Sequence, residues 1–302
     1  MRKLASVFLM LLLLCLGAAG VLYWRYVHRP LVNEPQLAPE TAAPSAEVSP
    51  RASIGNRNRS GSDARTGTGS EPELGAAGTV SALPALRSGE SLEYDVNVAT
   101  LNSTIATIQL NVREKRELAG KSVWHLQGLA HTGNPYRMVF ELDDEFDSYS
   151  DVANLESVQY EMHLSERGQK VTSVQRMLPG GQAAPPGISA ARVLPGTRDP
   201  LGMLHYLRST NWSKTTAVRS PVYDGRKLYD VRAVLVGRGI AVKVATGSYA
   251  TNKIEIHVYD NGAEMKDAHF VLYLANDAAR TPVLMEAVLP FATARVELTK
   301  AK

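Results

Sequence analysis

The stretch FVLYLANDAARTPVLMEAVLPFATARVEL, residues 270–298, decides the fold. Apolar side chains recur at every second position in Phe270–Leu274, Leu284 and Val288 with their neighbours form a second apolar run, and a polar segment ending at Pro282 separates the two. This period is typical of β-strands that have one covered face and one wet face. A short polar connection between two such runs indicates antiparallel pairing, because parallel strands need a long crossover. We therefore interpret the stretch as a closing hairpin of an antiparallel sheet, a structural element and not a site.

The same alternation recurs from Ser88 onward. It predicts further strands in 92–98, 106–112, 136–142, 158–164, 229–235, 254–258 and 296–298. About ten or eleven strands are expected, mostly joined by hairpins. A single sheet of that size must curl to bury its apolar face. The predicted fold class is therefore mostly β: a single antiparallel curved sheet or partly open barrel, formed by residues 88–302.

One helix is predicted in TRDPLGMLHYLRSTNW, residues 197–212. Asp199 suits the N-cap, and Pro200 suits the first helical position. The apolar stripe expected of a packed helix is present at Leu201, Met203, Leu204 and Leu207. The Pro/Gly-rich stretch 178–196 before the helix is predicted to be a long loop, either mobile or functional.

Residues 1–29 are predicted to be a membrane segment. Residues 4–24 are apolar and uncharged, close to the ~20 residues that span a bilayer. Arg2 and Lys3 precede them, and the short N-terminal tail favours the cytoplasmic side. The prediction is an N-terminal transmembrane helix.

Two alternatives to this anchor remain open. The small residues Gly17 and Ala19 are compatible with a cleaved signal peptide, although the apolar run continues past them. A lipoprotein site at Cys15 is disfavoured because Leu14 occupies a position where a small side chain is expected. All three readings place the rest of the chain outside the cytoplasm.

Residues 30–87 change composition. Pro, Ala, Ser, Gly and Thr dominate, and no aromatic residue is present. Such a stretch has too little apolar surface to offset the entropy lost on ordering, so it is predicted to be a disordered linker. A passive tether is the simplest role, and crossing a wall layer or docking a partner is the alternative.

Charge and cysteine content exclude several classes. The net charge is +3, and four of the basic residues lie within residues 1–29, so the remainder is close to neutral. No basic footprint for nucleic acid is present. Cys15 is the only cysteine, so no disulfide forms within the chain.

No catalytic motif is recognisable, and no cofactor is predicted. Gly237 and Gly239, in VGRGIAV (236–242), are interpreted as a turn or bulge between two strands. The acidic stretch ELDDEFDSYSD (141–151) does not have the spacing of a helix-flanked calcium loop. It is interpreted as a solvated edge or hairpin end.

His257 and His269 are the most interesting histidines. A hairpin centred near Ala263 places them opposite each other on one face. A metal site would need a third ligand, for which Glu255 or Tyr259 is the nearest candidate. A pair of surface histidines is more commonly incidental, so no metal is predicted and the two remain weak candidates.

Aromatic and methionine side chains on the covered faces indicate either core packing or the lining of an apolar cavity, since barrels of about this strand number can hold a small ligand. The candidate ligand-binding residues are Tyr94, Met138, Phe140, Tyr160 and Met162, with 178–196 near the mouth.

Five stretches in order along the chain carry a family resemblance: GESLEYDV (89–96), FDSYSD (146–151), DPLGMLHYLRS (199–209), YDGRKLYDVRAVLVGR (223–238) and LANDAARTPVLMEAVLPFATARVEL (274–298). In the last, the family pattern is matched at Asp277, Arg280, Pro282, Val283, Glu286 and Pro290. From about Gly89 to Leu298 the chain resembles a bacterial envelope family, domain of unknown function 3108. One departure lies at 101–108, where a glycine is expected.

The resemblance implies a secreted or anchored β-rich domain and brings no catalytic residues. The predicted location is the inner membrane, spanned once by residues 4–24, with the β domain in the periplasm. The leading hypothesis is a non-catalytic domain that binds an apolar ligand, such as a lipid, or an envelope protein. One alternative is a structural or scaffolding envelope protein without a ligand cavity. The other is a hydrolase with an unrecognised site near Asp143–Asp151 or His257/His269.

Overall fold

The computed structural model describes residues 86–302 except 99–102, 140, 167, 181, 184–185, 188 and 290–291. The predictions for the membrane segment 1–29 and for nearly all of the linker 30–87 lie outside these residues. Within the described part of the chain, no helix has the length and apolar character needed to cross a bilayer.

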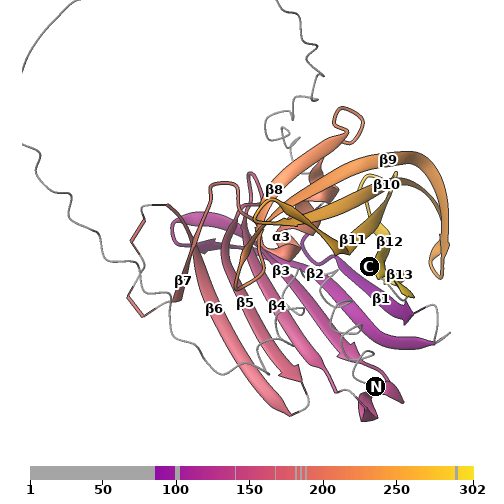
Figure 1. Cartoon of the computed structure of the whole chain (residues 1–302), viewed down its shortest axis with the longest axis horizontal. Helices are drawn as coiled ribbons and strands as arrows, with labels where there is room; N and C mark the ends of the chain where they lie inside the picture. Colours follow the sequence, from indigo (N-terminus) through magenta and orange to yellow (C-terminus); the bar gives the residue numbers. More distant parts are fainter. Residues whose placement is uncertain are drawn as a thin grey trace, which may run out of the picture.

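A single sheet dominates the described residues (Figure 1). Its strands are β1 (Ser91–Val98), β2 (Thr104–Leu118), β3 (Lys121–Thr132), β4 (Asp143–Asp151), β5 (Ser157–Glu166), β6 (Gln169–Pro179), β7 (Ser189–Val193), β8 (Ala217–Tyr223), β9 (Leu228–Val244), β10 (Gly247–Asp260), β11 (Ala263–Ala275), β12 (Pro282–Leu289) and β13 (Ala292–Ala301). The described chain thus has 13 strands, more than the number expected from the sequence.

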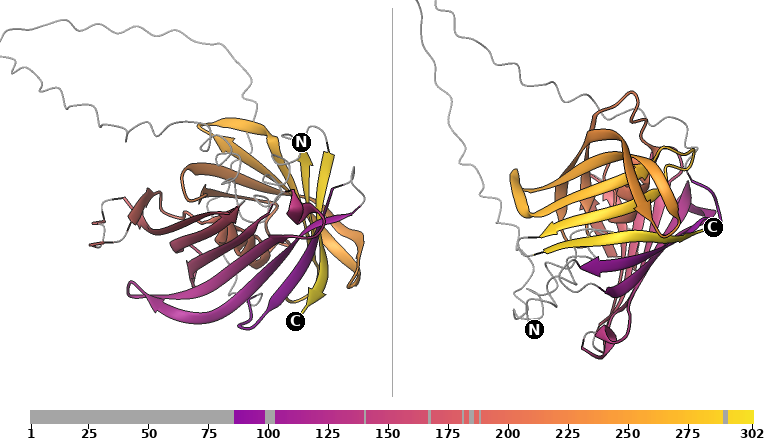
Figure 2. Two further views of the ribbon diagram at one scale, coloured as in Figure 1. Left: turned by 90° about the horizontal axis from the view of Figure 1, so that it is seen from below. Right: turned by 90° about the vertical axis from the view of Figure 1, so that its right-hand side faces the viewer.

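The strand order is β7-β6-β5-β4-β3-β2-β1-β13-β12-β11-β10-β9-β8. Strands that follow one another in the chain pair antiparallel, with two exceptions: β7 pairs parallel with β6, and β7 and β8 are the two ends of the sheet and do not pair with each other. The first and last strands, β1 and β13, also pair antiparallel, and Figure 2 shows the sheet curving through this junction. The predicted antiparallel curved sheet is confirmed.

The segment before the helix bridges the gap between the two ends of the sheet. Thr197 O accepts from Ser157 N of β5 (3.0 Å), and Arg198 forms an isolated bridge with Val222 of β8. The Arg198 amide donates to Pro221 O (3.0 Å), and its carbonyl accepts from Tyr223 N (2.8 Å). The sheet is therefore a nearly closed, barrel-like wall.

Helix α3 (Pro200–Ser209) lies inside this wall, and every one of its residues is buried. It packs mainly against β3, β4 and β8 (Figure 1). Asp199 caps it by accepting from Gly202 N (2.8 Å), with Pro200 in the first turn as the sequence predicted. Gly202 allows the close approach, because a Cβ there would lie 2.9 Å from Ser150 Oγ and 3.0 Å from Ser157 Oγ. The predicted helix and its cap are confirmed.

The inner face of the sheet supplies one apolar core. In β1 the alternation is complete, since Leu92, Tyr94, Val96 and Val98 are buried and the residues between them are not. Full burial of such side chains stabilises the fold by about 1.5–3 kcal/mol each. The cluster extends through the other long strands to Val296 and Leu298 of β13 and includes α3. The period-two pattern thus marks the inward side correctly.

The predicted strand at 136–142 is wrong. Tyr136–Met138 forms a short 3₁₀ helix after Pro135, and the Met138 side chain is 87% exposed. Phe140 lies outside the described residues. Alternating apolar residues misled here because this segment is a connection between β3 and β4, where no neighbouring strand fixes a covered face.

The acidic stretch 141–151 is also placed differently. It is not a solvated edge: Asp143–Asp151 forms β4, which lies between β3 and β5. Asp144 and Asp147 are buried. Asp144 points inward and accepts from Ser165 N (2.8 Å), whereas Asp147 points outward to His125. Each carboxylate accepts a hydrogen bond from an adjacent strand, which offsets part of the cost of its burial, while Asp144 Oδ2 is buried without a hydrogen-bond partner among the described residues.

Two smaller expectations need revision. The stretch 178–196 is not entirely loop, because Ser189–Val193 adds to β6 as the parallel strand β7. Gly237 and Gly239 do occupy an irregular, bulged region, but they lie within the single strand β9 and not between two strands. Gly239 has a φ of 66°, in the left-handed region that favours glycine.

Candidate functional site

Three of the five predicted ligand-binding residues lie on the inner face of the sheet. Tyr94 of β1 and Tyr160 and Met162 of β5 are all buried. The Tyr94 hydroxyl donates to Pro282 O (2.8 Å), and burial raises the pKa of Tyr160 well above its usual value. Met138 is on the outside and cannot line the interior.

The turn between β8 and β9 packs directly on Met162. A Cβ on Gly225 would lie 2.3 Å from Met162 Cε. Gln175 of β6 donates to Gly225 O (2.8 Å) and accepts from the Tyr223 hydroxyl (2.6 Å). This part of the inner face is therefore held shut across the gap between the two ends of the sheet.

A buried polar cluster fixes the N-terminus of α3 to β4 and β5. The Asp199 carboxylate accepts from Ser148 Oγ (2.5 Å) and Ser157 Oγ (2.6 Å), in addition to the cap. Burial raises the pKa of Asp199 above its usual value, and the hydrogen bonds from Gly202, Ser148 and Ser157 offset only part of that increase.

Arg198 lies beside this cluster but bonds to neutral groups. Its guanidinium donates to Ser220 Oγ (2.9 Å) and Asn154 O (2.8 Å), and it lies 3.7 Å from the centre of the Tyr206 ring. Burial lowers the pKa of Arg198. Within the described part of the chain, Arg198 Nε is buried without a hydrogen-bond partner. The other contacts of Arg198 and Asp199 join the N-terminus of the helix to the strands around it, so these two residues act as positioning groups for the helix.

The other end of α3 is tied to the start of β1. Buried Arg208 donates to Glu90 Oε1 (2.7 Å) and to Ala279 O (3.1 Å). Arg280 in turn donates to Arg208 O (3.0 Å) at the helix C-terminus. The helix is thus attached at its N-terminal end to β5 and β8 and at its C-terminal end to Glu90, just before β1, and to the connection between β11 and β12.

The described residues of β3 and β4 include Ser, His and Asp side chains, but these do not form the Ser–His–Asp arrangement that a hydrolase would need. His125 and Asp147 form a buried pair on the outer face, with Nε2 donating to Oδ1 at 2.6 Å. Ser148 follows Asp147 in the strand and therefore points to the opposite face, where it bonds Asp199 and Ser150. The sheet separates the hydroxyl from the imidazole.

The predicted juxtaposition of His257 and His269 is confirmed. They are directly opposite on β10 and β11, with stacked rings whose centroids are 5.2 Å apart. Of the two suggested neighbours, Glu255 is near both, and one ligand atom from each of the three lies within 4.8 Å of the others.

Basic groups surround this pair. Arg232 is opposite His257 on β9 and lies 4.4 Å from the centre of the Tyr259 ring. Lys253 Nζ is 3.7 Å from Glu255. His257 Nδ1 is already hydrogen-bonded to Glu264 (2.6 Å). These contacts compete with a cation for the same ligands.

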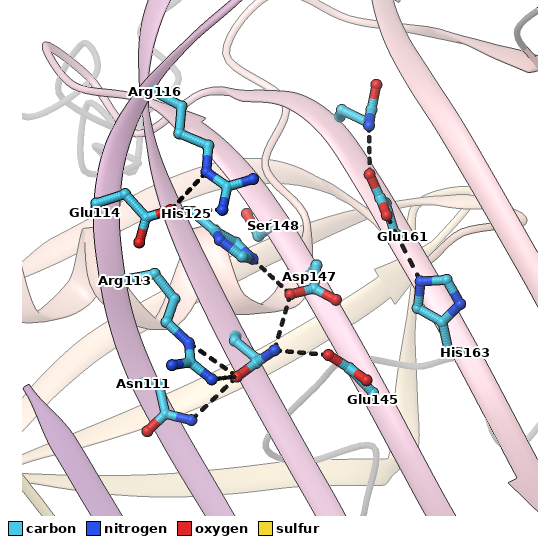
Figure 3. Close-up of polar contacts among 12 residues, drawn as sticks. Asn111, Arg113, Glu114, Arg116, His125, Glu145, Asp147, Ser148, Glu161 and His163 are labelled. Atoms are coloured by element: carbon cyan, nitrogen blue, oxygen red, sulfur yellow. Dashed lines mark hydrogen bonds and ion pairs between the residues drawn. The ribbon is translucent and has the colours of Figure 1, made fainter. Parts of the chain in front are cut away.

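A second cluster, on the outer face of β4 and β5, was not predicted from the sequence. Asp147, Glu161 and His163 each offer one ligand atom, and the three atoms lie within 4.8 Å of one another (Figure 3). We call these three residues the β4–β5 cluster. The only sequence signal was the spacing of polar residues at alternate positions in QYEMH, and nothing there specifies which strand pairs with it.

The fold and these sites define a class: a β-rich domain with a nearly closed sheet around one helix. The chain belongs to the family described as Protein of unknown function (DUF3108), whose profile matches residues 93–299. The resemblance noted from the sequence is thereby confirmed. No curated protein matches the chain.

Three solved structures are similar in part. One is a beta-barrel-like protein of domain of unknown function DUF1849 from Brucella abortus, with 8% identity, a TM-score of 0.47, and coverage of 71% of this chain and 97% of that chain. A protein described as a lipoprotein from Parabacteroides distasonis has 10% identity, a TM-score of 0.34, and coverage of 76% and 100%. A protein described as exported, with a YmcC-like fold, from Bacteroides fragilis has 10% identity, a TM-score of 0.28, and coverage of 72% and 96%. At these scores the likenesses carry no argument about function.

Proposed function

We propose that this chain is a membrane-anchored, extracytoplasmic, non-catalytic β domain that binds an apolar ligand, such as a lipid, on the inner face of its sheet. Residues 4–24 are the proposed single-pass anchor in the inner membrane, and residues 30–87 are the tether that holds the domain in the periplasm.

The observation that carries the proposal is the enclosed apolar inner face. Apolar side chains from strands all round the wall belong to one cluster, whereas α3 packs mainly against β3, β4 and β8. Apolar pockets at the mouths and interiors of barrels are common sites for small ligands. Tyr94, Tyr160 and Met162 are the proposed contacts, and residues 178–196 lie near the proposed mouth.

Native mass spectrometry tests ligand binding. Residues 86–302, once a cooperative thermal transition shows that they fold alone, should carry an added mass of lipid size. Val96→Phe adds volume on the inner face of β1 and should lower the occupancy. Asn97→Phe, in the same strand but on the outer face, is the matched control and should leave it unchanged. A ligand-free mass for the unaltered domain after gentle purification contradicts the proposal.

A scaffolding domain with a filled interior is the second candidate. Two contacts favour it: the Tyr94 hydroxyl is already bonded to Pro282 O, and Met162 already packs on Gly225. A ligand-free mass, together with a Val96→Phe variant that is simply less stable, supports this candidate over the first.

Location is tested separately. With intact cells, protease added from outside the inner membrane should degrade the β domain only after the outer barrier is opened. Protection that persists until the inner membrane is lysed contradicts the proposed periplasmic side.

A further inference from the structure

The β4–β5 cluster combines two carboxylates and one imidazole on adjacent strands. Asp147 is directly opposite Glu161 in the pairing of β4 with β5, so two carboxylates face each other on one side of the sheet. Like charges directly opposite are destabilising. His163 follows on the same face of β5, and its Nε2 lies 3.6 Å from Glu161 Oε2.

The arginines nearby do not neutralise these carboxylates directly. Arg113 donates to Gln127 Oε1 (2.5 Å), and the Gln127 amide group then donates to Glu145 Oε1 (2.6 Å) and Asp147 Oδ1 (3.3 Å) (Figure 3). Because arginine can only donate, the amide oxygen faces Arg113 and the amide nitrogen faces the acids.

The same relay occurs on the next pair of strands. Arg176 donates to Gln159 Oε1 (3.1 Å), and Gln159 donates to Glu161 Oε1 (2.5 Å). The two glutamine amides thus fix the orientation of Asp147 and Glu161 without adding a positive charge to the cluster.

In each of the three residues, one oxygen or nitrogen atom is held by a neighbouring side chain, and a second oxygen or nitrogen atom remains to bind an ion. Asp147 Oδ1 accepts from His125 Nε2, and Glu161 Oε1 accepts from Gln159. His163 Nδ1 is 3.4 Å from Thr172 Oγ1, which favours Nε2 as the free nitrogen. Supporting hydrogen bonds of this kind orient the ligands of metal sites.

The spacing suits an ion held between the atoms. The 3.6 Å separation of His163 Nε2 and Glu161 Oε2 is long for a hydrogen bond. Ligand atoms bound at about 2.0–2.2 Å to a tetrahedral Zn²⁺ lie roughly 3.3–3.6 Å apart. The Asp147 side chain is 8% exposed, Glu161 17% and His163 38%, so solvent and an ion reach the site from the His163 side.

We propose that Asp147, Glu161 and His163 bind a divalent transition-metal ion of the zinc class, with water completing the coordination. Imidazole and carboxylate together suit Zn²⁺ and its first-row neighbours better than Ca²⁺, which takes oxygen ligands. The ion bridges β4 and β5 and relieves the repulsion between Asp147 and Glu161. The site is independent of the proposed ligand on the inner face.

Zn²⁺ binding to the full-length chain tests the proposal. The protein, purified in a non-ionic detergent and stripped with chelator, is titrated with Zn²⁺ and separately with Ca²⁺ by calorimetry. One Zn²⁺ per chain at micromolar affinity or tighter is expected, with Ca²⁺ at least 100-fold weaker. His163→Gln and Glu161→Gln should each weaken Zn²⁺ at least 100-fold, and Thr172→Val about tenfold.

Two controls locate the ion. His257→Gln removes a ligand of the other histidine cluster, and Glu114→Gln removes an exposed carboxylate paired with Arg116; both should leave the affinity unchanged. Loss of binding in His257→Gln but not in His163→Gln overturns the assignment. So does a wild-type affinity weaker than about 100 µM, or equal loss in every variant.

Thermal unfolding separates a metal role from a structural one. In the metal-free protein, Glu161→Gln removes a like-charge contact and keeps an oxygen that accepts from Gln159, so its melting temperature should equal or exceed that of the wild type. Added Zn²⁺ should raise the melting temperature of the wild type and not that of Glu161→Gln. A metal-free Glu161→Gln protein that melts well below the wild type, with no Zn²⁺-dependent shift in either, overturns the proposal.

Discussion

Removing one partner of the buried ion pair between Arg208 and Glu90 should destabilise the protein far more than removing one partner of an ion pair on the surface of β1. Arg208 is 1% exposed and Glu90 10% exposed at the side chain, and Nη2 lies 2.7 Å from Oε1. Glu90→Ala leaves a cation buried at the end of α3. Removing one partner of a buried pair costs about 3–5 kcal/mol, which corresponds to roughly 6–20 °C in melting temperature for a domain of this size.

The matched control lies three residues away. Glu93 pairs with Lys300 (2.8 Å), but their side chains are 41% and 50% exposed. Glu93→Ala should cost only ~0.2–1 kcal/mol, and that cost should shrink as salt is added. The cost of Glu90→Ala should change little with salt, because burial limits screening.

Urea unfolding of residues 86–302, followed by circular dichroism, measures these costs by linear extrapolation. Arg208→Met and the double variant complete a cycle. The double variant should be more stable than the sum of the single costs predicts, by about 2–3 kcal/mol, because neither charge is then left alone. A cost below about 1 kcal/mol for Glu90→Ala, or strict additivity, would refute the view that this pair ties α3 to β1.

Two further predictions concern buried acids. Asp199→Ala removes the helix cap and leaves the hydroxyls of Ser148 and Ser157 without their acceptor, so it should lower the unfolding free energy by about 2–4 kcal/mol. Asp199→Asn keeps an acceptor and should cost less than half as much in the same urea assay. Equal costs for the two variants would contradict the capping role of Asp199. Burial raises the pKa of Asp144 to about 6, above the ~3.9 of an unfolded chain, so between these values the native state binds a proton that the unfolded state releases. Stability conferred by this group should therefore fall by about 2–3 kcal/mol as pH rises from 4 to 6, and Asp144→Asn should abolish that fall; a wild-type protein that gains stability relative to the variant over this range contradicts the sign.

Much of the wall could be predicted because its strands alternate cleanly. In β1 and β13, buried apolar side chains alternate with less buried polar ones, so a period of two marks both the strand and its inward side. Helix α3 was equally accessible, since its cap at Asp199 and Pro200 are local signals that do not depend on the rest of the fold.

The strands that were not predicted from the sequence lack this clean alternation of apolar and polar side chains. Strand β3 carries buried side chains on both faces, including His125 and Gln127 on the outer one, so its pattern is not a simple alternation. Strand β4 is acidic, and the burial of its acids depends on donors supplied by β3 and β5. No local signal distinguishes such a strand from a solvated turn.

Sites formed between strands were accessible only where a hairpin fixed the register. His257 and His269 belong to one hairpin, and an assumed centre near Ala263 placed them opposite each other. The turn itself lies at residues 261–262, and a shift in register between His257 and Tyr259 produces the predicted pairing. The β4–β5 cluster also lies on chain neighbours, but β4 had not been recognised as a strand, and so Asp147 had no predicted partner.

The two proposals occupy opposite faces of the same strand. Tyr160 and Met162 of β5 point into the core, while Glu161 and His163 point outward to β4 and β6. A slip of one residue in the pairing would exchange the two sets, so the register that buries Tyr160 is the one that assembles the metal ligands. The variants nevertheless separate them: Glu161→Gln should leave the lipid-sized mass unchanged, and Val96→Phe should leave the Zn²⁺ affinity unchanged. Loss of both properties in either variant would contradict the assignment of the two sites to independent, opposite faces of the sheet.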